Sequence, residues 1–163
     1  MCIIAILATA GLKGLGAAKE YAQRAHAHTD CLNFQSALEN YLLDQSSFPS
    51  AWSGLLETEG KFLNTLMGEE NEYNRGSTTY FHTRQVNNHP KAHGYIVTLN
   101  QFNDTWGKPY QIRVDQAFDG AVPLPRAYHD RLGSELLGIE VFVHSAGRDG
   151  DFSTIKDNIT SVD

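Results

Sequence analysis

The sequence predicts an α+β protein in which one long helix comes first and a small antiparallel sheet follows. The stretch 17–44 contains no proline or glycine and repeats its apolar residues at helical spacing. Three short runs rich in β-branched residues follow after residue 94, and turn signals separate them. The chain has 163 residues, of which 41% are hydrophobic and 20% charged, which suits one packed domain plus an appendage.

The predicted long helix begins in an apolar run and continues as an amphipathic helix. The run 2–12 is apolar and ends at Lys13, so it is shorter than the roughly 20 residues that cross a membrane. Gly11, Gly14 and Gly16 lie at the junction and should make the helix more flexible there. One apolar face then comprises Tyr21, Ala25, Cys31, Leu32, Phe34, Leu38, Tyr41 and Leu42.

The length of this helix has a consequence for its surroundings. A continuous helix over residues 2–44 would be about 65 Å long, which is more than a domain of this size can bury. Its first half should therefore contact lipid or another copy of the chain. We divide the chain into an apolar helical segment, 1–16, for a membrane or filament core, and a globular domain, 17–163, with amphipathic helix 17–45. A signal peptide cleaved after Ala8-Thr9-Ala10 is the alternative, but the run lacks the positively charged start of such peptides.

The remaining predicted elements are short. Pro49 ends the long helix, and Ser50 is a suitable N-cap for a second helix. Turn residues at 115–120 should separate two strands, with Gly120 supplying a positive φ. The predicted helices cover 52–56 and 61–67, the strands cover 78–81, 95–99, 110–114 and 138–143, and a proline-rich connection covers 122–138.

The charge balance and the motifs exclude several classes of function. The net charge is −6, and no cluster of Lys and Arg interleaved with aromatic residues occurs, which argues against a nucleic-acid partner. Cys2 and Cys31 lie outside any CxxC motif, so we interpret them as free buried thiols. The sequence has no GxSxG, P-loop, GxGxxG or Cys/His dyad motif. We therefore expect no enzymatic activity.

Two further residue groups have simpler interpretations than a functional site. His82, His89 and His93 are typical of solvated loop histidines, without the HExxH motif of a zinc site. Asp115 and Asp119 flank a glycine turn, which favours turn residues over a glycosidase pair.

A carboxylate-rich stretch near the C-terminus predicts a cation site. Asp149, Asp151 and Asp157 lie within nine positions, and such a cluster repels itself unless a cation binds. Ca²⁺ takes six to eight oxygen ligands in a flexible arrangement. Gly147 and Gly150 would let backbone carbonyl groups turn toward the ion. Further oxygens come from Ser145, Ser153, Thr154 and Asn158.

Two other interpretations of this stretch are an EF-hand and a solvated acidic tail. An EF-hand starting at Asp149 fails at position 6, which is Thr154, and at position 12, which is Thr160. Glycine and glutamate are needed at those positions. A solvated acidic tail is still an alternative interpretation, because disorder is common near a C-terminus.

Four stretches, in order along the chain, are similar to motifs of one protein superfamily. The stretch 103–110, Asn-Asp-Thr-Trp-Gly-Lys-Pro-Tyr, is similar to a DPWGNPY strand entry, with Thr105 in place of proline. The stretch 145–159 is similar to an S-x-G-x-D-G … DDI calcium loop. The other two are the apolar start, 3–8 with 14–20, and the helix end, 38–41 with Phe48-Pro49. Together they resemble the type IV pilin superfamily and, within it, the major pseudopilin of type II secretion.

The resemblance implies a pilin-like fold and a calcium ion near the C-terminus. The implied ligands are the side chains of Asp149 and Asp157 and a backbone oxygen near Ser145. Asn158 occupies a position where a second aspartate is frequent, and Asp151 is the candidate to compensate for the missing charge. These five residues are the predicted metal site.

The resemblance also implies a non-enzymatic filament subunit that supports protein export across the outer membrane of a bacterium. Its partners would be other copies of itself, other pseudopilins and the inner-membrane secretion platform. The helix would lie in the inner membrane and the globular domain in the periplasm. Alternatives are a minor pilin or a calcium-dependent periplasmic binding module and, less favoured, a secreted hydrolase.

One departure from the family concerns the start of the chain. The basic leader, the cleavage-site glycine and the Phe-Thr-Leu-x-Glu segment do not occur in the sequence. We therefore expect Met1 to fall inside the mature helix, through a late start codon, a cropped sequence or a truncated gene.

Overall fold

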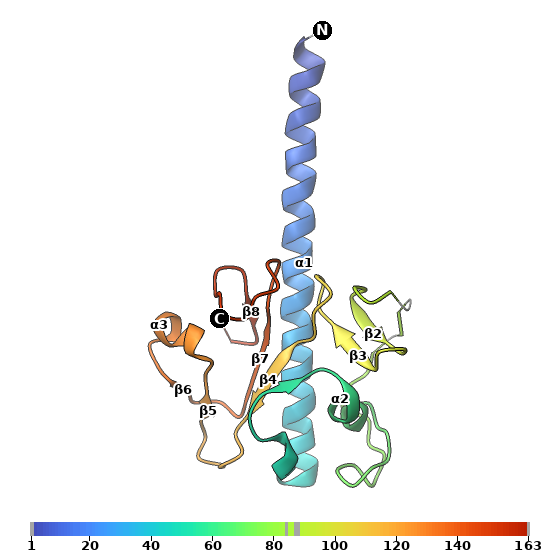
Figure 1. The fold of residues 1–163 in the computed structure, drawn as a ribbon, viewed down its shortest axis with the longest axis vertical. Helices are drawn as coiled ribbons and strands as arrows, with labels where there is room; N and C mark the ends of the chain where they lie inside the picture. The colour runs from blue at the N-terminus through green and yellow to red at the C-terminus, as the bar shows by residue number, and fades with distance from the viewer. Residues whose placement is uncertain (1, 84, 87–88, 163) are drawn as a thin grey trace.

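A computed structural model describes residues 2–162 except residues 84, 87 and 88. One long helix, α1, runs the length of the molecule, and a smaller globular part lies beside its C-terminal half (Figure 1). The elements are α1 (Cys2–Gln45), η1 (Ser50–Trp52), β1 (Leu56–Glu57), α2 (Gly60–Leu66), β2 (Gly94–Ile96), β3 (Gln101–Asn103), β4 (Gln111–Val114), β5 (Val122–Pro123), η2 (Arg126–Tyr128), α3 (His129–Leu132), β6 (Leu136–Leu137), β7 (Val141–Ser145) and β8 (Ile159–Thr160).

The main sheet has four antiparallel strands in the order β1-β4-β7-β8. Ile112 of β4 pairs with Val143 of β7, and His144 of β7 pairs with Thr160 of β8. Two smaller antiparallel pairs, β2-β3 and β5-β6, lie outside this sheet. A long helix on an antiparallel sheet confirms the predicted α+β class.

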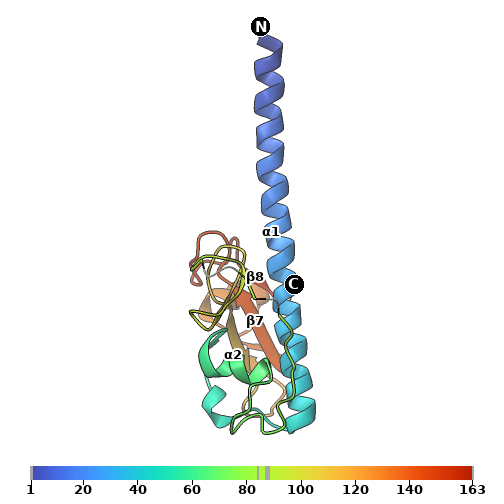
Figure 2. The same ribbon diagram turned by 90° about the vertical axis from the view of Figure 1, so that its right-hand side faces the viewer.

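The core forms between one face of α1 and one face of the sheet. Figure 2 shows the sheet and loops gathered on one side of the helix. Phe34 is fully buried, with its ring stacked on Phe81 at 4.1 Å and edge-on to Phe102 at 5.2 Å. Ile112 and Val114 alternate with outward residues along β4, as a half-covered strand requires. Over residues 15–45, where the structure describes the side chains of α1, the buried residues are Ala27, Cys31, Phe34, Ala37, Leu38 and Tyr41.

The predicted apolar face of α1 is right for Cys31, Phe34, Leu38 and Tyr41 and wrong for Tyr21, Ala25 and Leu32. Cys31, which is buried, belongs to the face that packs on the sheet. Tyr21, Ala25 and Leu32 are exposed. At 100° per residue these three are turned by about 80–120° from Cys31, so they lie outside the face that the sheet covers.

Several short elements differ from the prediction. The second helix is only the 3₁₀ turn η1, and the strand expected at 78–81 does not form. Instead the backbone N–H groups of Tyr80 and Phe81 both donate to the Leu66 carbonyl, which holds Phe81 in the core. The expected strand 138–143 is shifted to Val141–Ser145, because Gly138, Ile139 and Glu140 form a bend. The connection 122–138 contains β5, η2, α3 and β6, which the sequence analysis missed.

Candidate functional site

The first candidate feature is the part of α1 that extends beyond the globular part. Figure 1 shows the N-terminal half of the helix projecting without a covering element. Among residues whose side chains the structure describes, Ala27 is the first core residue. Leu15 is 69% exposed. The helix continues through Gly16 without a break.

The second feature is a stripe of exposed residues along α1 on the side away from the sheet, with Glu39 as a charged member beside Leu43. Tyr21, Leu32 and Leu43 are 77%, 42% and 82% exposed. They are eleven residues apart, which is three helical turns plus about 20°, so they follow one line along the helix. Exposed small residues lie beside that line: Ala18, Ala25 and Ser36. The sheet leaves this face uncovered, and we call it the outer stripe.

An exposed helix crosses a membrane only if it is also long and apolar enough. Over the described residues, no helix combines the length and the apolarity that crossing a membrane requires.

Polar side chains of α1 hold the loop between β7 and β8 against the helix. Glu20 Oε2 pairs with Arg148 Nη1 at 3.1 Å. One turn later, Arg24 Nη1 donates to the backbone oxygen of Asp157 at 3.4 Å. Glu20 and Arg24 lie on one helix face because they are four residues apart. These contacts were not predicted, although the four-residue spacing of Glu20 and Arg24 is visible in the sequence.

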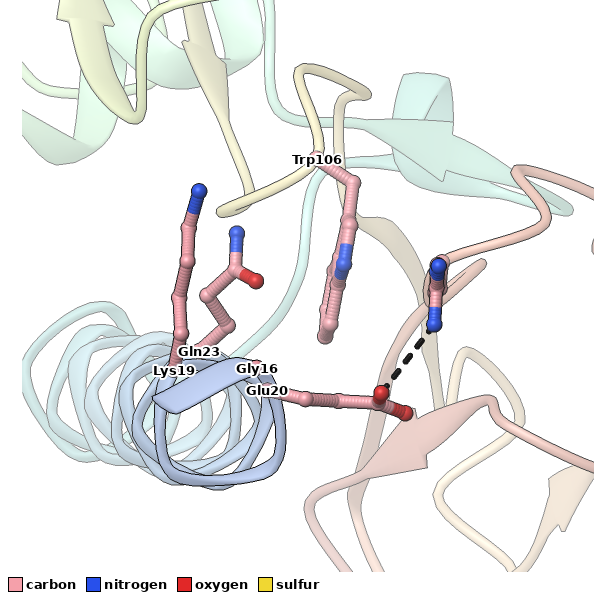
Figure 3. A pocket seen from close by; sticks show the side chains of 6 residues that line it. Gly16, Lys19, Glu20, Gln23 and Trp106 are labelled. Atoms are coloured by element: carbon pink, nitrogen blue, oxygen red, sulfur yellow. Dashed lines mark hydrogen bonds and ion pairs between the residues drawn. The ribbon is translucent and has the colours of Figure 1, made fainter. Parts of the chain in front are cut away.

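A pocket of about 360 Å³ lies where α1 leaves the globular part (Figure 3). The Trp106 ring stands across from Lys19 and Gln23 of the helix. Gln23 Nε2 donates to the Thr105 carbonyl at 3.3 Å, and Thr105 Oγ1 donates to the Gln23 carbonyl at 3.2 Å. This exchange fixes the 103–108 turn to the helix.

A buried carboxylate joins this turn to the end of β7. The Asp104 side chain is fully buried, and its Oδ1 accepts hydrogen bonds from the backbone N–H groups of Trp106 and Lys108 at 2.9 and 3.0 Å. Its Oδ2 accepts a hydrogen bond from Ser145 Oγ at 2.5 Å. Burial raises the pKa of Asp104, and the hydrogen bonds oppose that rise. The Ser145 hydroxyl therefore points to Asp104, which leaves the predicted backbone oxygen near Ser145 as the ligand that this position could offer.

The loop 146–158 brings two of the predicted ligands together. The Asp149 N–H donates to Asp157 Oδ2 at 3.0 Å. Asp157 Oδ1 is buried and has no hydrogen-bond partner. Gly147 has a φ of +67°, and a Cβ atom there would lie 2.3 Å from the Asp157 backbone oxygen. The close approach of these two backbone segments thus requires glycine.

The other predicted ligands make contacts of their own. Asp151 Oδ1 accepts from the Ser153 N–H at 2.8 Å, and the Ser153 hydrogen bonds lower the pKa of Asp151. Thr154 Oγ1 donates to Asp149 Oδ2 at 2.6 Å and lowers the pKa of Asp149. These hydrogen bonds thus favour the charged forms of both carboxyl groups. Asn158 Nδ2 donates to Tyr128 Oη at 3.1 Å, away from Asp149.

The loop 146–158 places some of the groups that a cation site needs, but not all of them. Within the described residues, no group of three His, Cys, Asp or Glu side chains is arranged to hold a metal. The unpartnered, buried Asp157 Oδ1 and the charged Asp149 carboxylate are the groups that suit an ion. The side chains of Ser145 and Asn158 are turned elsewhere in this conformation.

Comparison of the chain with known protein families, with curated proteins and with solved structures found no match.

Proposed function

We propose that this chain is a structural subunit of a pilin-like filament, of the type II secretion pseudopilus class, that supports protein export across the outer membrane. The observation that carries the proposal is the long, partly unburied α1 with its outer stripe of exposed side chains. A stripe of large apolar side chains flanked by small ones suits close packing of helix against helix. The motif resemblance supports the same class.

In this proposal, α1 helices of successive copies pack on one another and the globular parts face outward. The inner membrane would hold the N-terminal segment, the globular part would lie in the periplasm, and other pseudopilins and the inner-membrane platform would be partners. Growth of the polymer would push exported proteins, and the chain itself would carry out no catalysis.

Site-specific crosslinking tests the outer stripe as the assembly surface. Ala25→Cys places a thiol on the exposed stripe, and Glu70→Cys places one on an exposed position of the globular part. Cys31 is fully buried and can stay, whereas Cys2 is replaced by alanine. The chain is expressed behind a pseudopilin leader and a Phe-Thr-Leu-x-Glu segment in a bacterium with a type II system. We expect both variants to form filaments, and we expect disulfide-linked dimers only from Ala25→Cys.

Introducing charged residues on the outer stripe tests the same assembly surface by blocking it. Tyr21→Glu and Leu43→Glu alter side chains that are 77% and 82% exposed, so the fold should persist. We expect filaments to be lost because the charges would be buried between helices. Normal filament formation by both variants would refute the proposed assembly surface.

We also propose that the loop 146–158 binds one Ca²⁺ ion through Asp149 and Asp157. The support is the buried, unpartnered Asp157 Oδ1 beside the Asp149 carboxylate, whose charged form is favoured. Asp151 would contribute charge nearby. The ion would order the loop and fasten it to the end of the sheet.

A further inference from the structure

Phe118 is an exposed aromatic residue in a strained backbone conformation. It lies in the turn between β4 and β5, its side chain is 54% exposed, and its φ is +54°. Positive φ is uncommon for residues other than glycine and is an outlier for a bulky side chain. Such strain persists only where the surrounding structure enforces it, and it concentrates at binding and functional sites.

Hydrogen bonds hold this turn in one conformation. Asp115 Oδ2 accepts from the Gly120 N–H at 2.8 Å, which closes the turn around Phe118. Gln116 Nε2 donates to the Pro49 carbonyl at 2.8 Å, which fixes the turn beside the end of α1. The ring is therefore presented at a fixed place, so binding through it costs little further ordering of the chain.

The turn and the pocket beside Trp106 lie at opposite ends of the globular part. The pocket opens where α1 leaves the globular part, and the turn lies where α1 ends (Figure 1). Between Gln23, which lines the pocket, and Gln45 the helix rises about 33 Å. Phe118 therefore cannot reach this pocket in its own chain, whereas the Phe118 of a second copy shifted along the helix axis can.

The pocket offers an aromatic ring and positive charge. Trp106 is half-buried, and its ring stands across the pocket from Lys19 (Figure 3). Lys19 is exposed, and among the residues that the structure describes no ion pair involves it. Arg148 lines the same pocket with a side chain that is 69% exposed. The volume of about 360 Å³ is enough for an aromatic side chain.

The turn carries the opposite charge. The chain contains no Lys or Arg between residues 114 and 125, and the exposed Asp119 follows Phe118 directly. A Phe118 ring placed against Trp106 would therefore bring the Asp119 carboxylate near Lys19 and Arg148. An aromatic pair and an attraction between opposite charges thus fit one and the same arrangement.

We infer that Phe118 of one copy of this chain inserts into the pocket beside Trp106 of the next copy. The contact joins two different surfaces, so it repeats from copy to copy along an open filament and does not close a pair. The inference rests on the proposed filament and adds a contact between globular parts to the packing of α1 helices.

Cysteines placed beside the contact test it in assembled filaments. Gly16→Cys lies on the pocket, where an added Cβ atom meets nothing within 4 Å, and Ala117→Cys lies at an exposed position next to Phe118. A chain with both changes, and with Cys2 replaced by alanine, is expressed and oxidised like the Ala25→Cys chain. We expect tryptic peptides joined between positions 16 and 117. Peptides joined only between two positions 16, or only between two positions 117, would overturn the inference.

The Ala25→Cys chain separates this inference from the proposed filament. Crosslinks at position 25 without a link between 16 and 117 would overturn the Phe118 contact and leave the filament in place. Loss of both kinds of crosslink would overturn both. Glu70→Cys, which is exposed elsewhere on the globular part, is the matched control and should give no link to position 16.

Phe118→Gly separates docking from folding. Glycine adopts a positive φ without strain, so the purified variant should melt at the same temperature as the parent or higher. In the chain with both cysteines it should lose most of the link between 16 and 117, because the aromatic pair is removed. A much lower melting temperature would show that the ring packs within its own chain, and an unchanged link would likewise overturn the inference.

Reversal of the charges gives a second, independent test. Lys19→Glu and Asp119→Lys should each reduce the link between 16 and 117, and the two changes together should restore it. The exposed residues Arg75 and Asp130, changed to Glu and Lys, are the matched controls and should leave the link unchanged. Equal loss in the single and the combined variants would contradict the pairing of these charges.

Discussion

His93 Nε2 lies 2.7 Å from Asp30 Oδ2 and joins the segment before β2 to the middle of α1. The same carboxylate oxygen accepts a hydrogen bond from the Tyr110 hydroxyl at 2.8 Å. One aspartate of the helix thus binds two segments that are 63 and 80 residues away in sequence. The loop histidine is a structural link rather than a solvated side chain.

This link predicts a loss of stability above neutral pH. The hydrogen bond to Asp30 raises the pKa of His93 above its ordinary value of 6.5. A raised pKa in the folded state means that the stabilisation is complete below pH 6.5 and is lost as pH rises through the folded-state pKa. The imidazole is 38% exposed, so screening limits the effect to roughly 1 kcal/mol or less.

Urea denaturation at pH 6 to 9 measures this effect, with His93→Gln as the comparison. The difference in the free energy of unfolding between the two proteins should shrink as pH rises. A difference that stays constant across this range would contradict the proposed link.

The buried His144 predicts that folding stability also falls at acidic pH, in the opposite direction to the pH dependence predicted for His93. Burial lowers the pKa of His144 to about 3, and its Nδ1 lies 3.0 Å from Tyr128 Oη. A depressed pKa means that stability is present above pH 6.5 and is lost as pH falls toward 3. The loss at pH 5 should be about 2 kcal/mol relative to pH 7. His144→Gln should show a flatter profile over this range, and an unchanged acid slope would contradict the assignment.

Gly147 and Gly120 are two glycines with positive φ whose substitution by alanine should have different effects on stability. Both have positive φ, but a Cβ atom at Gly147 would lie 2.3 Å from the Asp157 backbone oxygen, while at Gly120 nothing lies within 4 Å. Gly120→Ala should cost about 1 kcal/mol from backbone strain alone, and Gly147→Ala about 2–4 kcal/mol. Thermal or urea unfolding measures both. Equal losses would mean that the β7–β8 loop is not packed as described.

Phe34 and Leu43 are two large apolar residues of α1, one buried and one exposed, whose substitution by alanine should have different effects on stability. Phe34 is fully buried among aromatic rings, whereas Leu43 is 82% exposed. Phe34→Ala should lower the free energy of unfolding by about 3–5 kcal/mol, and Leu43→Ala should change it by less than about 0.5 kcal/mol. A large loss from Leu43→Ala in the monomer would show that the outer stripe is covered.

Calcium should stabilise the folded chain through the loop 146–158. A site that binds only the folded state adds about 2.7 kcal/mol when calcium is at 100 times its dissociation constant. We expect millimolar Ca²⁺ to raise the melting temperature and EDTA to lower it. Asp149→Ala should abolish the response, and the exposed Asp130→Asn should keep it. Identical melting with Ca²⁺ and with EDTA would remove calcium from the proposal.

The predictable parts of the fold are those with strong periodicity. The helical spacing of Cys31, Phe34 and Leu38 identified the core face of α1, and the β-branched run before Asp115 identified β4. The strand predicted at 95–99 overlaps β2 at Tyr95 and Ile96, whereas residues 97–99 form a turn. The strands β3, β5 and β6 have only two or three residues, so alternation gives almost no signal for them. Phe81 is buried without belonging to a strand, which no periodic pattern encodes.

The candidate site was predictable in composition but not in geometry. The cluster of aspartates in 145–158 is visible in the sequence, and the structure brings Asp149 next to Asp157. The bond from Ser145 to Asp104 joins positions 41 residues apart, so local spacing gives no indication of it. The exposure of Phe118 at a positive φ likewise depends on how the turn folds, because the turn motif alone does not predict it.

The contacts of Glu20 with Arg148 and of Gln23 with Thr105 precede Ala27, the first core residue among those of α1 whose side chains the structure describes. They therefore act where the hydrophobic core no longer holds the helix, and they set the direction in which residues 2–19 leave the globular part. Those residues span about 27 Å, so a tilt of about 10° there moves the far end by about 5 Å. If copies of the chain assemble as proposed, these two polar contacts, of which only the Glu20–Arg148 pair is well exposed, would set the spacing between neighbouring copies.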